Sequence, residues 1–232
     1  MKKKLVVFTG SGISAESGIP TFRDSVKGLW ENFNIEEVCT AGCLKKDPER
    51  VHEFYNTLRD NYSKCEPNEA HKVLAELEKD YDVTIITQNV DDLHERAGST
   101  NVIHLHGEIM KCRDSGNTKY IFDIPEDENG NRHTYPGMKI DGHPIRPHVV
   151  FFGENVPNMD KAIYEVQNAE IFVIIGTSLV VYPAASLTGY VDDNAPVYYI
   201  DPRPKPSPYI QNLTMIAQPA TKGILELKEL LK

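Results

Sequence analysis

Cysteine, tryptophan and long apolar runs are scarce in this chain. Its 232 residues include four cysteines and one tryptophan. No apolar run approaches the roughly 20 residues that a helix needs to cross a bilayer. Four cysteines in a chain of this length do not indicate a disulfide framework, which is typical of small secreted domains. We therefore expect a protein with free thiols that does not act at a membrane.

Basic residues are also fewer than acidic residues. There are 25 Lys and Arg against 34 Asp and Glu, giving a formal net charge of -9 at pH 7. Because the basic residues do not cluster, we expect no nucleic-acid partner; an acidic surface suits a basic partner such as a lysine-bearing peptide. The early apolar run Leu5–Phe8 is too short for a secretory signal, so we expect a cytoplasmic location. No long amphipathic repeat calls for a second chain, and a monomer is the default.

Apolar segments of strand length alternate with segments of helical periodicity. The strand candidates are continuous and β-branched, as in a parallel sheet covered on both faces. They are residues 5–9, 83–87, 102–105, 149–152, 171–175, 197–200 and 213–216. Helices are expected from Asp47-Pro48 to about Lys64, over 69–79 behind Asn68, over 159–168 behind Asn158, and over 223–231. This order predicts an α/β fold with a doubly wound, Rossmann-like parallel sheet.

Two segments depart from this alternation. Residues 109–147 are polar and rich in Gly, Asn, Asp and Pro, and strands at 120–124 and 132–135 are predicted to form a hairpin around Asn129-Gly130. We interpret this segment as a small module inserted into the sheet. Residues 1–108 and 148–232 then form the nucleotide-binding part of one domain spanning 1–232. Residues 25–65 are expected to form a helical excursion.

Polar clusters follow several of the predicted strands. They are residues 9–12, 88–91, 104–107, 176–178 and Asp201. Since ligands of open α/β sheets bind outside the carboxyl ends of the strands, these clusters predict one shared site. Gly10–Ala15 fits the G-x-G-x-x-G/A dinucleotide loop, although a tight strand-to-helix turn without ligand gives the same pattern. No acidic residue obviously ends a second strand to bind a ribose.

Five longer motifs occur in order along the chain. They are Thr9–Arg23, Thr87–Gly98, His104–Glu108, Arg146–Glu154 and Gly176–Ser178. Together they resemble the sirtuin family of NAD-dependent protein deacylases, most closely its bacterial and mitochondrial class III subgroup, over essentially the whole chain. The resemblance implies an enzyme that uses NAD to remove acyl groups from lysine in proteins or peptides. The products would be nicotinamide and O-acyl-ADP-ribose.

The resemblance also implies roles for individual residues. His106 matches the general base, a task that suits a histidine because its ordinary pKa lies near neutral pH; a buried structural histidine is the alternative. Asn89 and Asp91 match the catalytic pair that positions the ribose and the nicotinamide amide, and Asp91 could also cap the next helix. His104, two residues earlier on the same strand face, is expected to support His106. The remaining cofactor-binding residues would be Gly10, Ser11, Gly12, Glu16, Thr21, Phe22, Arg23, Gln88, Val90, Gly176, Thr177, Ser178, Asp201 and Ala220.

The acyl-lysine substrate is expected to pair with residues 149–154 by strand addition. The substrate-binding residues would be Tyr55, Leu58, Arg59, Val149, Phe151, Phe152, Gly153 and Glu154. The resembled subgroup holds acidic acyl groups with a Tyr-x-x-Arg pair. Here Tyr55 is present, but Leu58 occupies the arginine position, and Arg59 is either its substitute or a surface charge. The preferred acyl group therefore stays open: it could be acetyl, succinyl or malonyl, or a longer apolar group.

Zinc is the second departure from the family pattern. Sirtuins usually hold a structural zinc with four cysteines in the small module, whereas this chain has Cys112 at one matching position and Ser115, Met138 and Asp141 at the others. Methionine and neutral serine are poor zinc ligands, so we predict no zinc. Two further functions stay open: NAD hydrolysis or ADP-ribosyl transfer, and NAD sensing without catalysis.

Overall fold

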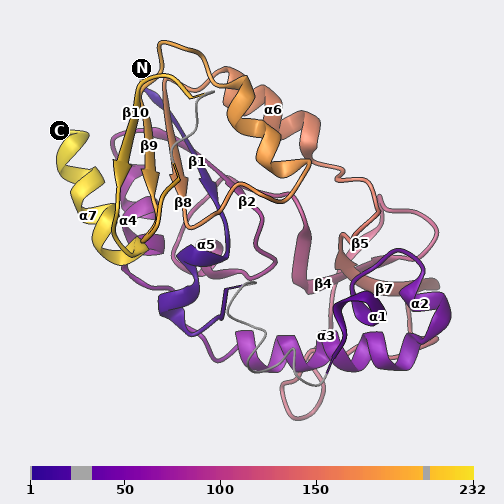
Figure 1. The fold of residues 1–232 in the computed structure, drawn as a ribbon. Helices are drawn as coiled ribbons and strands as arrows, with labels where there is room; N and C mark the ends of the chain where they lie inside the picture. The colour runs from indigo at the N-terminus through magenta and orange to yellow at the C-terminus, as the bar shows by residue number, and fades with distance from the viewer. Residues whose placement is uncertain (1, 22–32, 206–209) are drawn as a thin grey trace.

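The computed structural model describes residues 2–21, 33–205 and 210–232 (Figure 1). Within these residues, six parallel strands form one sheet in the order β10-β9-β8-β1-β2-β3. Their bounds are β1 Lys4–Thr9, β2 Asp82–Thr87, β3 Val102–His104, β8 Ile171–Ile175, β9 Val197–Ile200 and β10 Leu213–Ile216. Because β1 pairs with β2 on one side and with β8 on the other, the strand order reverses beside β1. The predicted Rossmann-like sheet is confirmed, and this reversal is where such sheets bind ligands.

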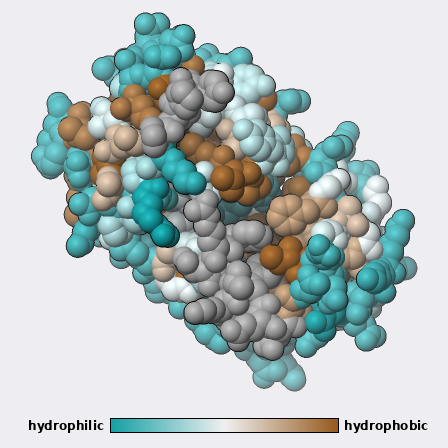
Figure 2. Space-filling view, viewed as in Figure 1, coloured by the Kyte–Doolittle hydropathy of each residue, from teal (hydrophilic) through white to brown (hydrophobic). Residues whose placement is uncertain are grey.

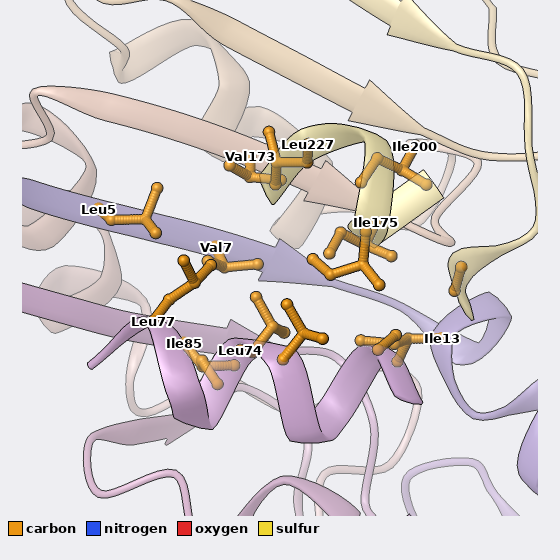
Figure 3. Close-up of a cluster of buried hydrophobic side chains, with 14 of the residues drawn as sticks. Leu5, Val7, Ile13, Leu74, Leu77, Ile85, Val173, Ile175, Ile200 and Leu227 are labelled. Atoms are coloured by element: carbon orange, nitrogen blue, oxygen red, sulfur yellow. The ribbon is translucent and has the colours of Figure 1, made fainter. Parts of the chain in front are cut away.

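Helices cover both faces of this sheet (Figure 1). On one face, α4 (Glu69–Leu77) and α7 (Ala220–Leu230) pack against Leu5 and Val7 of β1, and Figure 3 shows this cluster. On the other face, α6 (Met159–Gln167) and the 3-10 helix η4 (Ala184–Tyr190) pack against Val6 and Phe8. Successive strand side chains point to opposite faces, so a continuous apolar run supplies both cores.

Local signals set the helix starts that were predicted best. Asp47 accepts a hydrogen bond from the Arg50 N–H at the start of α3 (Pro48–Tyr62), and Asn68 caps α4. Helix α7 begins at Ala220, three residues before its predicted start at Gly223. A Cβ on Gly223 would lie 2.2 Å from Cγ2 of Ile200. The glycine therefore lets α7 approach the sheet closely instead of marking the helix start.

The small module is an antiparallel sheet in the order β5-β4-β7-β6. Its strands are β4 Gly107–Asp114, β5 Ile121–Asp123, β6 Lys139–Ile140 and β7 His143–Val149. The predicted hairpin is wrong, because β5 pairs with β4 and residues 132–135 form no strand. Thr134 is instead buried against α3, where its N–H donates to Oδ1 of Asn56 at 3.0 Å.

The segment 149–152 is not a strand of the large sheet, which corrects a second prediction. Val149 ends β7, and Phe152 forms one isolated bridge with Thr40. Val149 and Phe151 belong to a separate cluster that joins α1 (Ile35–Val38), α2 (Cys43–Lys46) and α3 to the module. The short helix α5 (Leu93–Arg96) follows β2. Among the described residues, no helix has the length and apolar character needed to span a membrane.

Candidate functional site

Two glycine-containing loops cross at the carboxyl ends of β1 and β8. The N–H of Gly10 donates to Ile175 O at 3.0 Å, and the N–H of Gly12 donates to Gly176 O at 2.8 Å. A Cβ on Gly12 would lie 2.6 Å from the Gly176 Cα, so a larger residue does not fit. The short turns η1 (Ser11–Ile13) and η2 (Ala15–Ser17) follow. The crossing leaves bare backbone at the reversal point of the sheet, as close approach of a pyrophosphate requires.

Ser14 joins the two residues predicted to orient the cofactor. The Asn89 side-chain amide donates to Ser14 Oγ at 3.1 Å, and Ser14 Oγ donates to Asp91 Oδ2 at 3.0 Å. Burial raises the pKa of Asp91 to about 6, although hydrogen bonds from Leu93 N–H and Ser14 oppose the shift. Sequence reasoning missed Ser14. A hydroxyl at the fifth position of the glycine loop was the available signal.

His106 lies two residues after the end of β3 and is partly buried. Its Nδ1 is 2.9 Å from the carbonyl oxygen of Gln88, so Nδ1 carries the proton and donates. Nε2, the opposite nitrogen, is then an acceptor and has no partner among the described residues. Burial lowers the pKa of His106, partly offset by the Gln88 bond. A neutral imidazole with one accepting nitrogen can act as a general base near neutral pH.

Gln88 and Thr177 connect the ends of β2 and β8. The Gln88 side-chain amide donates to Thr177 Oγ1 at 2.8 Å, and the Tyr199 hydroxyl donates to the Thr177 carbonyl at 2.7 Å. Ser178, next in the chain, is partly exposed. Since Gln88 also accepts from His106, the same residue links the base to the loop after β8.

Other predicted cofactor-binding residues form hydrogen bonds with neighbouring residues around this edge of the sheet. The Glu16 carboxylate accepts hydrogen bonds from the N–H and hydroxyl of Thr221 at 3.0 and 2.8 Å, which fixes the start of α7 beside Ala220. Asp201 accepts from the Arg203 N–H at 2.8 Å. Ser11, Thr21 and Val90 are partly buried. The predictions for Phe22 and Arg23 lie outside the described residues.

Four of the predicted substrate residues form a second, apolar group next to His106: Tyr55, Leu58, Val149 and Phe151. The N–H of Val150 donates to the His106 carbonyl at 2.9 Å, which joins the two groups. Phe151 stacks on Tyr55 with ring centroids 5.8 Å apart, and the Arg146 guanidinium lies 4.0 Å over Phe151. On the face shown in Figure 2, hydrophobic residues gather where the large and small parts of the molecule meet.

Residues 152–154 mostly make contacts within the protein. The Phe152 N–H donates to Cys39 O, and its carbonyl accepts from the Ala41 N–H, both at 2.8 Å, while its side chain is exposed. Gly153 adopts φ +89°, which turns the chain after the bridge. The Glu154 carboxylate accepts from Arg146, Arg113 and the Phe151 N–H.

Arg59 is buried between α3 and the module, with 1% of its surface exposed. Its Nε donates to the Ile109 carbonyl at 2.7 Å, and Nη1 donates to Asn56 Oδ1 at 2.6 Å and to Thr134 Oγ1 at 3.4 Å. Nη2 is buried and has no partner within the described residues. The neighbouring Leu58 is buried in the apolar cluster with Tyr55. Arg59 is therefore a link between helix and module.

The module positions that match the family's zinc ligands do not fit a zinc site. Cys112 is buried with Ile124 and Ile145, and Met138 packs against the same cluster. The Cys112 thiol donates to the Phe122 carbonyl at 3.7 Å, and Cys112 is the single Cys or His among these four positions, whereas a structural zinc site uses four such ligands. Ser115 and Asp141 are exposed. Among the described residues, no group of three or more His, Cys, Asp or Glu side chains is placed to hold a metal ion.

The chain matches the family model described as Sir2 family over residues 10–183. It is 52% identical over 204 residues to an NAD-dependent protein deacylase of Aggregatibacter actinomycetemcomitans, covering 88% of this chain and 95% of the relative. It is also 48% identical over 233 residues to an NAD-dependent protein deacylase of Bacteroides thetaiotaomicron, covering 99% and 98%.

Solved structures agree with this relationship. A Sir2 homolog in complex with NAD has a TM-score of 0.84 and 38% identity, covering 100% of this chain and 91% of the homolog. A mutant Sir2 homologue in complex with ADP ribose has a TM-score of 0.82 at 38% identity, covering 99% and 94%. The family match and the relatives span most of the chain, and the resemblance seen in the motifs is confirmed. This protein belongs to the Sir2, or sirtuin, family.

Proposed function

We infer that this protein is an NAD-dependent protein-lysine deacylase. The observation that carries this inference is the arrangement at the reversal point of the sheet. His106 has its Nδ1 proton bound to Gln88 O and its Nε2 available within the described site. Asn89 and Asp91, on the loop that Gln88 begins, form a buried hydrogen-bonded group with Ser14 on the loop after β1. A site that only binds NAD does not require a base in this position.

The residues present fit NAD. The crossing at Gly12 and Gly176 gives the space that a pyrophosphate needs against backbone. Asn89 and Asp91 supply an amide and a carboxylate for the ribose and the nicotinamide amide. When bound, NAD supplies a ribose carbon whose bond to nicotinamide breaks as the acyl oxygen attacks. His106 Nε2 accepts the proton of a ribose hydroxyl, and the Gln88 carbonyl holds the ring in that tautomer.

Acetyl and other short neutral acyl groups are the proposed substrates. Leu58 and Phe151 make the cluster around Tyr55 apolar. The Tyr55 hydroxyl lies 3.5 Å from Cys39 Sγ, and burial raises the pKa of Tyr55 well above its usual value. The guanidinium of Arg59 is bound to the Ile109 carbonyl. An acyl carboxylate would thus be desolvated with little charge compensation, which is costly.

Succinyl and malonyl groups are the second candidate, favoured by the buried Nη2 of Arg59 that lacks a partner within the described residues. Arg59→Lys separates the two proposals. If Arg59 only links α3 to the module, kcat/KM should fall by a similar factor for acetyl-lysine and succinyl-lysine peptides. A selective loss of succinyl turnover would show that Arg59 binds the acyl carboxylate and would contradict the neutral-acyl proposal.

We further propose that the module needs no zinc and that the protein is a cytoplasmic monomer without nucleic-acid or membrane partners. The poor fit of Cys112 and its neighbours supports the first proposal. All four cysteines are free, which suits a reducing compartment. The net charge of -9 does not favour binding to phosphate backbones.

Nicotinamide release with and without an acetyl-lysine peptide tests the central inference. A deacylase releases nicotinamide only with the peptide and forms one free lysine for each NAD consumed. Equal NAD loss without peptide would instead identify an NAD hydrolase, and NAD binding without any turnover would identify a sensor.

A further inference from the structure

His104 contacts the loop after β2 that carries Asn89 and Asp91. It ends β3 two residues before His106, and 7% of it is exposed. Its Nδ1 lies 3.0 Å from the carbonyl oxygen of Asn89, and its Nε2 lies 2.8 Å from Glu95 Oε1 on α5. One ring therefore spans from the backbone of the cofactor loop to a carboxylate on the following helix.

Both partners of this ring are acceptors. A backbone carbonyl accepts only, and an ionised carboxylate accepts only. A neutral imidazole has one N–H and can satisfy one of the two, whereas an imidazolium donates to both. His106 differs because one of its nitrogens has an acceptor partner while the other is left to accept a proton. The two histidines of the His-x-His segment thus have opposite hydrogen-bonding requirements.

The charges around the ring favour the imidazolium. Burial alone would lower the pKa of His104, but the hydrogen bond and charge of Glu95, the charge of Glu108 and the Asn89 carbonyl together outweigh it, so the pKa is raised above its ordinary value. The His104 bond in turn lowers the pKa of Glu95 against the effect of burial, so this carboxylate is ionised at neutral pH. The other titratable groups that face this region are Asp91, His94, Glu108, Lys111 and His148.

We propose that His104 is a positioning residue, held as an imidazolium between Glu95 and the Asn89 carbonyl, that keeps Asn89 in place for the reaction. This proposal rests on the proposed deacylase function. When the ring loses its proton, it must release one of its two partners. The positioning of Asn89 is therefore complete at pH values below the pKa of His104 and is lost as the pH rises through that pKa. We expect this loss to give an alkaline limb in the pH profile of kcat.

Histidine-ring ¹⁵N NMR of the whole wild-type protein tests the charge state without any turnover. The His104 signals are identified by their absence in His104→Gln. We expect both nitrogens to be protonated at acidic pH and the ring to titrate with a midpoint above pH 6.5. A midpoint below pH 6.5 would overturn the proposal. The result is independent of substrate, so it stands even if the deacylase assignment fails.

Glu95→Gln tests the effect on catalysis, because it keeps an acceptor for Nε2–H but removes the charge. We expect the alkaline limb of kcat to move to lower pH. On such a limb the rate changes about tenfold per pH unit, so a displacement of one unit lowers kcat at alkaline pH about tenfold. The KM for the acyl peptide should change little. Glu108→Gln is the matched control, because Glu108 lies near the same ring but pairs with Lys111 at 2.7 Å.

The control variant Glu108→Gln should retain most of the wild-type dependence of kcat on pH. If Glu95→Gln and Glu108→Gln give the same profile as wild type while His104→Gln also keeps full kcat, the positioning role is refuted. If wild type releases nicotinamide equally well without peptide, the deacylase function fails, and the NMR titration alone decides the state of His104.

Discussion

Gly12→Ala should force apart the two loops that form the proposed phosphate-binding edge. A methyl group at this position would lie 2.6, 2.8 and 3.0 Å from Cα, O and C of Gly176. Ordinary contact begins at 3.4 Å, so the loops must separate by about 0.8 Å, and no flexible side chain can absorb the movement. Overpacking of this kind costs about 1–3 kcal/mol. Loss of the hydrogen bond from Gly12 N–H to Gly176 O adds about 0.5–1.5 kcal/mol.

The lower conformational entropy of the unfolded alanine variant offsets about 0.4–1 kcal/mol of this cost, which leaves a net destabilisation of roughly 0.5–4 kcal/mol. For a chain of this size, each kcal/mol lowers Tm by about 2–4 °C. Calorimetry should therefore show a Tm lower by roughly 1–16 °C and a smaller stabilisation by NAD. Gly189→Ala is the control, because its Cβ would meet nothing within 4 Å. Equal Tm and equal NAD binding for Gly12→Ala and Gly189→Ala would show that the two loops are not in the close contact described.

Three further predictions follow from the same geometry. The acidic limb of kcat/KM should lie below pH 6.5, because burial lowers the pKa of His106 and the base must be unprotonated; a limb above 6.5 would contradict this. A strong zinc chelator should leave Tm and turnover unchanged, and loss of either would show that the module holds metal. Gly107→Ala should lower Tm more than Gly12→Ala does, because its Cβ would lie 2.1 Å from His148 O and its φ is +88°. An unchanged Tm would contradict this close approach of Gly107 to His148.

Features encoded by neighbouring residues could be predicted from the sequence. The caps at Asp47 and Asn68 depend on bonds to N–H groups two or three residues away, and both are present. The parallel sheet was predictable because strands covered on both faces must be apolar throughout. The polar clusters after β1, β2 and β8 were predictable as one site because carboxyl ends of parallel strands share an edge.

Features that depend on distant contacts were missed. The turn at Asn129-Gly130 indicated a hairpin, but Thr134 is held by α3, so no second strand forms. Gly223 indicated a helix start, but its role is to let α7 approach Ile200. The direction of the Arg59 side chain follows from the Ile109 carbonyl, fifty residues away, and no local pattern encodes it. Ser14 likewise acquires its role through Asn89 and Asp91.

The assignment of His106 as the general base is tested most directly by nicotinamide release. Wild type and His106→Ala are compared in the presence of NAD and an acetyl-lysine peptide, and NAD affinity is measured in parallel. We expect the substitution to lower release about 10²- to 10⁴-fold, the range for removing a general base. NAD affinity and Tm should stay close to those of wild type. Peptide-dependent release that persists in His106→Ala would show that the imidazole bound to Gln88 is not the base.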